Sequence, residues 1–265
     1  MSAHPHPVFL SPALPTELLW HIVHHCAFPS TLVVCSSRVE FLSAVSRQVK
    51  HQKHPHHPAR GAEYEEAADE GGQEASVKKE GQLPRPFSTA DARAAQLLAA
   101  PLYQVAVARH IRVVFIPTVS HLRAYLSVFS VADAKVTAPP SPTHGIGTAP
   151  KEPLLLVYGL LDLHRSTSEW SVQGISNTAA AIVETTRRVG FQAVAVEPQT
   201  YEEVCMENLL AERMPILSGS ARRPGPDLEG SGWTGRTVDV RSVLRRWFRF
   251  RHGDWDSQSS EKPTS

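Results

Sequence analysis

The clearest indication of the fold is the run Leu154-Leu-Leu-Val-Tyr158, which is followed after a loop by a second run at residues 175–188. Five consecutive apolar residues without alternation indicate a strand that is buried on both faces, as in a parallel sheet. The later run is rich in alanine and has a helical pattern. A buried strand followed by a helix predicts a right-handed crossover to a parallel neighbour.

The same strand–helix unit recurs three more times along the chain. Thr31-Leu-Val-Val-Cys35 precedes an amphipathic run in which Ser37 and Glu40 have the spacing of a capping box. Apolar runs at residues 111–116 and 193–196 are each followed by a further helical pattern. Four such units predict an α/β fold with a mostly parallel sheet flanked by helices. Further elements are expected at residues 16–26, 89–108 and 241–247, all helical, and at 248–250, a short strand.

Composition suggests where the domain is interrupted. Residues 47–92 hold a His/Pro cluster and then a Glu/Ala/Gly run, with too few apolar side chains to offset the entropy of ordering. We expect a disordered insertion there and a second, Pro/Ser/Gly-rich loop at 137–151. The remaining boundaries are a flexible amino terminus at 1–13, a single α/β domain formed by 14–46 and 93–252, and a flexible tail at 253–265.

Overall composition excludes several classes of protein. The 265 residues carry a net charge of +1, so nucleic acid or a membrane would have to be bound by a local patch. Three widely spaced cysteines without a CxxC favour a reducing compartment. The first residues lack the features of a secretory signal, and no apolar run approaches the ~20 residues of a membrane helix. We expect a location in the nucleus or cytoplasm.

Motifs for nucleotide binding and hydrolysis are incomplete in this sequence. The nearest approach to a phosphate-binding loop is residues 145–152, where Pro150 replaces the second glycine and Glu152 replaces the magnesium-binding hydroxyl. The strand ending at Tyr158 lacks a terminal acid, and Asp162 follows four residues later. The sequence also lacks a GxSxG or HExxH motif. We therefore expect no catalytic residues, no metal and no cofactor.

Two isolated features have ordinary structural interpretations. His21 and His25 have the i, i+4 spacing of a metal pair, but the apolar residues of this predicted helix lie opposite them, which predicts a solvent-facing position. Cys35 lies at the end of a strand, where active sites of open sheets gather. Without a neighbouring base it is interpreted as a buried structural thiol.

The carboxyl end carries the strongest signal for a ligand. Residues 221–252 contain eight arginines and three acids, with Trp233, Trp247, Phe248 and Phe250 interleaved. Arginine forks and aromatic platforms suit phosphate backbones and unstacked bases. The alternative is a solvated basic face over an aromatic core face. The candidate nucleic-acid-binding residues are Arg245, Arg246, Arg249 and Arg251.

Residues 154–176 resemble the Walker-B strand, loop and following helix of RecA-like recombinases and their paralogs. In that family an apolar strand ends in an acid, and a loop with an arginine and a Glu–Ser pair leads into a helix. Arg165, Glu169 and Ser171 occupy comparable places. Tyr158 stands where the acid belongs, and the strand and phosphate loop that should precede the helix at 16–26 are absent. The resemblance therefore implies a degenerate RecA-like fold without an intact ATP site.

The resemblance implies a subunit of a heteromeric complex. The leading hypothesis is a Shu-type recombinase-paralog complex that assists homologous recombination and DNA repair, with another RecA-like subunit as the partner. An alternative within the same fold is the Elongator accessory ring, which serves transfer-RNA modification.

A third hypothesis is a small α/β enzyme, and it belongs to a different class of function. Its site would use Ser36, His121, Asp162 or Glu197, which follow strands and are gathered at one edge of the sheet by topology. Monomeric behaviour or a nucleotide-dependent melting temperature would distinguish it from the other two.

Overall fold

The computed structural model of the protein describes residues 6–25, 27–53, 95, 97–99, 101–130, 153–199, 205–217 and 236–256. The strands are β1 (Val8–Ala13), β2 (Ala27–Val34), β3 (Ile111–Phe115), β4 (Pro153–Tyr158), β5 (Gln192–Pro198), β6 (Arg213–Pro215), β7 (Thr237–Asp239) and β8 (Arg249–Arg251). The helices are α1 (Pro15–His25), α2 (Arg38–Lys53), α4 (Leu102–Ala108), α5 (Val119–Val128), α6 (Leu160–Arg165), α7 (Val172–Val189), α8 (Met206–Ala211) and α9 (Val240–Leu244).

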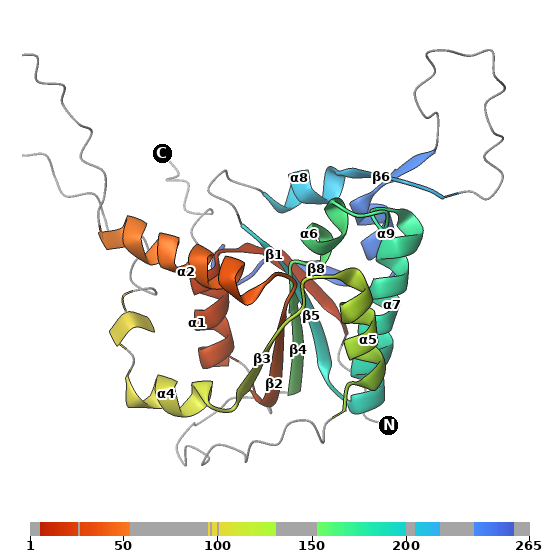
Figure 1. Ribbon diagram of the computed structural model, residues 1–265. Coiled ribbons are helices and arrows are strands. Elements are labelled where there is room, and N and C mark those ends of the chain that lie inside the picture. Colours follow the sequence, from red (N-terminus) through yellow and green to blue (C-terminus); the bar gives the residue numbers. More distant parts are fainter. Residues whose placement is uncertain are drawn as a thin grey trace, which may run out of the picture.

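Six of these strands form one parallel sheet in the order β3-β2-β4-β5-β1-β8 (Figure 1). The central strands are buried on both faces, as the continuous apolar runs predict. β6 and β7 form a separate antiparallel pair. The predicted α/β fold with a parallel sheet flanked by helices is confirmed.

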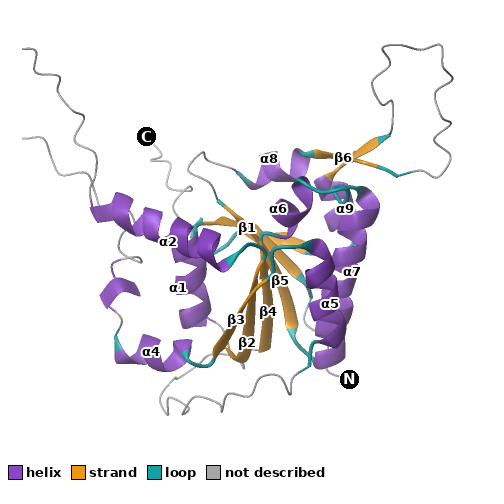
Figure 2. Cartoon of the chain, viewed as in Figure 1, coloured by secondary structure: helices purple, strands orange, loops and turns teal. Residues whose placement is uncertain are grey.

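Helices cover both faces of the sheet (Figure 2). The chain moves from β1 to β2 to β3 in one direction along the sheet, and α1 and α2 lie on one face. It then returns through β4 to β5 in the other direction, and α5 and α7 lie on the opposite face. Right-handed crossovers produce this alternation, because reversing the direction of travel moves the connecting helix to the other face.

Side chains cap the starts of several helices, and the capping box predicted at Ser37 and Glu40 is confirmed. At α2 the Ser37 amide donates to Glu40 Oε2 at 2.8 Å, and the Glu40 amide donates to Ser37 Oγ at 3.2 Å, which completes the capping box. Thr118 caps α5 by accepting from the His121 amide at 3.2 Å. Ser171 caps α7 by accepting from the Gly174 amide at 3.0 Å.

The flexible amino terminus predicted at residues 1–13 is wrong for residues 8–13. They form β1, which lies between β5 and β8 and buries Phe9 completely. The strand expected to be missing before α1 is therefore present. Ser11 and Pro12 interrupt the apolar pattern that would have predicted this strand. The shift in register between Leu10 and Ala13 accommodates the proline.

Two other boundaries also need correction. The insertion predicted at 47–92 is wrong for residues 47–53, because α2 continues to Lys53 and Gln48 is buried, accepting a hydrogen bond from the Thr16 amide. The tail predicted at 253–265 is ordered at its start, where Trp255 is buried and its Nε1 donates to the Pro12 carbonyl at 2.9 Å.

Several predictions fall outside the described residues. They include the remainder of the predicted insertion at 54–92, the loop at 137–151 and the tail beyond 256. Among the helices that the structure describes, none is both long and apolar enough to cross a membrane.

Candidate functional site

The carboxyl ends of β2, β4, β5 and β1 form the place where an open α/β sheet ordinarily binds its ligand. The connections that leave β2 and β1 go to one face, whereas those that leave β4 and β5 go to the other. Cys35, Tyr158 and Glu197 lie at these ends, as the sequence predicts. All three are buried.

The junction between β1 and α1 is a single residue, Leu14. Its amide donates to Glu17 Oε2 at 2.9 Å, and its carbonyl accepts from the Leu18 amide at 3.0 Å as the helix begins. A phosphate-binding loop places several backbone N–H groups around the anion before the helix starts. One residue cannot form such a loop, so the chain enters α1 without a phosphate cradle.

Tyr158 fills the space beside this junction. Its hydroxyl donates to the Ala13 carbonyl at 2.9 Å, and its ring packs against Phe41 at a centroid distance of 6.0 Å. Burial, and then the nearby Glu197, raise the pKa of Tyr158 above its usual range, so the hydroxyl stays protonated and donates. Tyr158 therefore joins β4 to the end of β1 where the resemblance expects an acid.

Glu197 is a buried carboxyl that caps α6. Its Oε1 accepts from the Leu161 amide at 2.8 Å, and its Oε2 accepts from the Asp162 amide at 3.2 Å. Burial raises the pKa of Glu197 to about 8, although these two hydrogen bonds and Arg165 act in the opposite direction. Gly159, with φ of 89°, makes the left-handed turn that brings α6 onto this carboxyl.

We expect Glu197 to make the stability of the fold depend on pH. Folded Glu197 keeps its proton up to about pH 8, whereas the unfolded group releases it near its ordinary 4.5. Between pH 4.5 and 8 the folded state therefore binds more protons than the unfolded state. The stabilisation that Glu197 gives the folded state is complete below pH 4.5 and is lost as the pH rises toward 8. The Glu197→Gln variant has no titrating group at this position, so its stability lacks this dependence on pH.

Urea denaturation of both proteins between pH 5 and 8 measures this contribution. The stability of wild type relative to Glu197→Gln should fall by about 4 kcal/mol across the range. All other titrating groups are common to the two proteins and cancel. A difference that stays constant with pH would contradict the assignment.

Asp162 and Arg165 lie on the exposed side of α6. Arg165 donates to Asp162 at 3.4 Å and to Glu212 at 2.7 and 3.2 Å, and its guanidinium lies 5.8 Å from the centroid of the Trp170 ring. Asp162 is thus partnered at the surface. Arg165 fastens α6 to the residue that follows α8.

The residues of the hypothetical enzyme site are not joined into a catalytic unit in the described structure. Ser36 donates to the neighbouring Ser37 carbonyl at 3.4 Å, and His121 is exposed in the first turn of α5. The oxygens of Glu197 are occupied by backbone amides. Burial also raises the pKa of the Cys35 thiol well above its usual range, which opposes a role as a nucleophile.

His21 and His24 of α1 are partnered within the protein. His21 pairs with Asp254 at 3.0 Å, and the ring of His24 stacks on Trp20 while its Nδ1 lies 2.8 Å from the Trp20 carbonyl. The solvent-facing interpretation is therefore wrong for His21, which is mostly covered. Within the described ranges no group of three His, Cys, Asp or Glu side chains could hold a metal ion.

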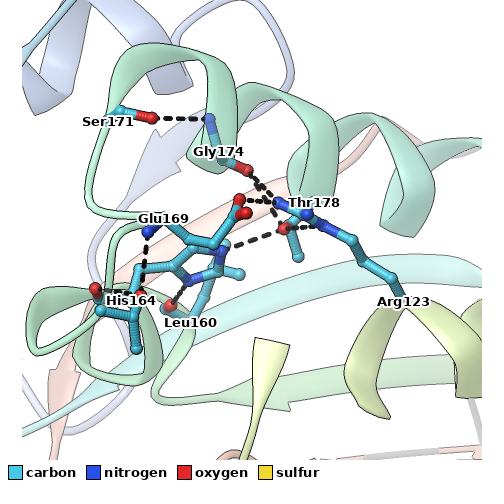
Figure 3. A network of polar contacts seen from close by, with 8 residues as sticks. Arg123, Leu160, His164, Glu169, Ser171, Gly174 and Thr178 are labelled. Carbon is cyan, nitrogen blue, oxygen red and sulfur yellow. Dashed lines mark hydrogen bonds and ion pairs between the residues drawn. The ribbon is translucent and has the colours of Figure 1, made fainter. Parts of the chain in front are cut away.

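A polar network between α5 and α7 is the feature that sequence reasoning missed (Figure 3). Arg123 of α5 donates to Glu169 at 2.7 Å, to the Gly174 carbonyl at 2.9 Å and to Thr178 Oγ1 at 3.0 Å. Glu169, which matched the Glu–Ser pair of the resemblance, is therefore the partner of Arg123. The network packs α5 against the loop that leads into α7.

His164 completes this network from α6. It is fully buried, with Nδ1 at 2.7 Å from the Leu160 carbonyl and Nε2 at 3.0 Å from Thr178 Oγ1. Because a carbonyl only accepts, Nδ1 carries the proton. Burial lowers the pKa of His164, which favours the neutral ring, so Nε2 is the acceptor nitrogen; it lies beside the Thr178 hydroxyl, which is also 3.2 Å from the Gly174 carbonyl.

The four candidate arginines lie along the β8 edge of the sheet. Arg245 and Arg246 follow α9, and Arg249 and Arg251 occupy alternate positions of β8; all four are exposed. They form no ion pair with any described residue. We call these four residues the arginine edge.

The aromatic residues of this segment face the protein interior. Phe248 is buried, and Phe250 packs beside Phe9 at a centroid distance of 5.9 Å. Trp247 also packs against the core. The interpretation of Phe248, Phe250 and Trp247 as stacking platforms is therefore wrong, whereas the arginines remain available; Trp233 lies outside the described residues.

Comparisons with protein-family models, with curated proteins and with solved structures found no match.

Proposed function

We propose that this protein is a non-catalytic RecA-like subunit of a heteromeric complex that assists homologous recombination and DNA repair. The observation that carries the proposal is the one-residue junction at Leu14, which replaces a phosphate loop, together with the Tyr158 hydroxyl bound to the Ala13 carbonyl. A parallel α/β sheet ordinarily binds its ligand at this place. Here buried protein side chains fill it.

The arginine edge supplies the contact to nucleic acid in this proposal. Arg249 and Arg251 are two residues apart on a strand, which separates their Cα atoms by about 6.6 Å. Their exposed forks are free to bind successive phosphates, and the aromatic rings beside them serve the core. Such a surface binds the backbone of nucleic acid without reading its bases.

Purification of the tagged chain from its source cells, followed by mass spectrometry and calorimetry, tests the proposal. We expect a second RecA-like polypeptide in stoichiometric amount. The isolated chain should give no saturable heat with Mg-ATP, because it lacks the loop amides, lysine and hydroxyl that hold the nucleotide. A stable monomer in cell extracts, or ATP binding in the low micromolar range, would overturn the proposal.

A further inference from the structure

Five large apolar side chains are exposed around the β3 edge of the sheet. Leu102 of α4 is 89% exposed and Val39 of α2 is 74% exposed, which leaves most of each side chain in solvent. Exposed apolar side chains are typical of interaction sites where neighbouring elements bring several of them to one side of a protein. We call the following set the β3-side surface: Val39, Leu42, Leu102, Val105 and Val113.

The elements that carry this surface lie on one side of the sheet. Figure 1 shows α1, α2 and α4 on that side, with β3 the nearest strand. The Phe41 ring of α2 lies 5.9 Å from that of Phe115 in β3, and α4 packs against α1. Ile111, Val113 and Phe115 are alternate residues of β3 and therefore lie on the same face of the strand, the face that α1 and α2 cover.

Helix α4 buries the polar Gln104 and exposes the apolar Leu102 and Val105. Gln104 is 5% exposed, and its Nε2 has no hydrogen-bond partner in the described part of the chain. Leu102 and Val105, three residues apart on one helix face, point away from the protein. A helix that served this core alone would have the opposite pattern, so its outer face is built for another contact.

The β3-side surface is flanked by positive charge. The outer faces of α2 and α4 carry Arg38, Arg47, Lys50 and Arg109, and none of them forms an ion pair with a described residue. Glu40 is the single acid in α2, and it is held by the Ser37 amide. The surface therefore complements a segment that combines apolar side chains with carboxylates.

We infer that the β3-side surface binds an amphipathic, acidic segment of the partner polypeptide. The inference rests on the proposed function for the existence of that partner. β3 is also one of the two edge strands of the described sheet, and such an edge ordinarily requires protection. A second copy of this chain suits the surface poorly, since like charges would meet.

Site-specific photo-crosslinking in the source cells tests this inference. Benzoylphenylalanine is placed in the full chain at Leu102 or Val39, and at Val128 as a control. Val128 is also largely exposed, but it lies on α5, on the opposite side of the sheet. Mass spectrometry then identifies the linked peptides.

We expect links from positions 102 and 39, and not from 128, to a segment of one partner that carries both apolar and acidic residues. In the purified complex, Leu102→Glu should weaken binding at least tenfold, and Val128→Glu should leave it unchanged. Arg109→Glu should also weaken binding, and the corresponding Glu→Arg change in the linked segment should restore it.

Four results would overturn the inference. They are links to residues 54–94 of this chain, links to a second copy, equal labelling from all three positions, and no link from positions 102 and 39. Residues 54–94 are included because six acids lie between 63 and 74. The fourth result, with a RecA-like partner still recovered in the complex, would refute this inference alone. An acidic segment of an unrelated protein linked here would refute only the proposed function.

Discussion

Replacing Phe9 with alanine is expected to lower the free energy of unfolding by about 3–5 kcal/mol. Phe9 is fully buried in β1, and its ring meets those of Phe248 and Phe250 at centroid distances of 6.3 and 5.9 Å. The variant loses both the apolar transfer energy and these edge-on contacts. A cavity would remain where β1 joins β5 to β8.

Urea denaturation followed by circular dichroism measures this change. Val39→Ala is the matched control, because Val39 is largely exposed and its truncation should change stability by less than about 0.5 kcal/mol. Equal stability of the two variants would mean that residues 8–13 do not form an interior strand. The sheet order would then be wrong at β1.

The strands that the sequence predicts are those with an unbroken apolar pattern. Leu154-Leu-Leu-Val-Tyr158 and residues 193–196 are buried on both faces, so their composition alone distinguishes them from helices or alternating strands. β1 reads Val-Phe-Leu-Ser-Pro-Ala and lacks that signal. Its place in the sheet depends on pairing with β5 and β8, which lie far away in the sequence.

The candidate site was predictable in position and not in detail. The sequence places Tyr158 and Glu197 at the ends of two strands, and a parallel sheet brings the carboxyl ends of its strands together. That Glu197 caps α6 depends on the left-handed turn at Gly159, for which the sequence offers no specific signal. The network around Arg123 joins residues 46 to 55 positions apart, and only the packing of α5 on α7 brings them together.

The carboxyl-terminal segment illustrates why composition alone was ambiguous. Arginines and aromatic residues alternate there, which fits either a nucleic-acid surface with stacking platforms or a basic face over an apolar one. The register of β8 separates the two kinds of side chain: Phe250 packs inward, and Arg249 and Arg251 are exposed. This arrangement favours phosphate contacts over base stacking.

Changing the four residues of the arginine edge to alanine is expected to weaken single-stranded DNA binding by the complex strongly. Each arginine that meets a phosphate releases counterions, so each contact contributes about 0.7 to the slope of log affinity against log salt. Loss of four contacts should flatten that slope by about 3 and lower the affinity most at low salt. The four side chains are exposed, so folding should be unaffected.

Two variants serve as controls for this change. Replacing the same four residues with lysine keeps the charges and should keep the salt slope, although the bidentate geometry is lost. Arg187→Ala removes one exposed arginine of α7, outside the arginine edge, and should leave the slope unchanged.

The proposed nucleic-acid contact is tested by the salt dependence of single-stranded DNA affinity, measured for the partner-bound complex with the wild-type or the four-alanine chain. We predict a slope for the variant complex that is about 3 smaller in magnitude than that of wild type, together with a normal melting temperature. Equal affinity and equal slope for the two complexes would contradict it.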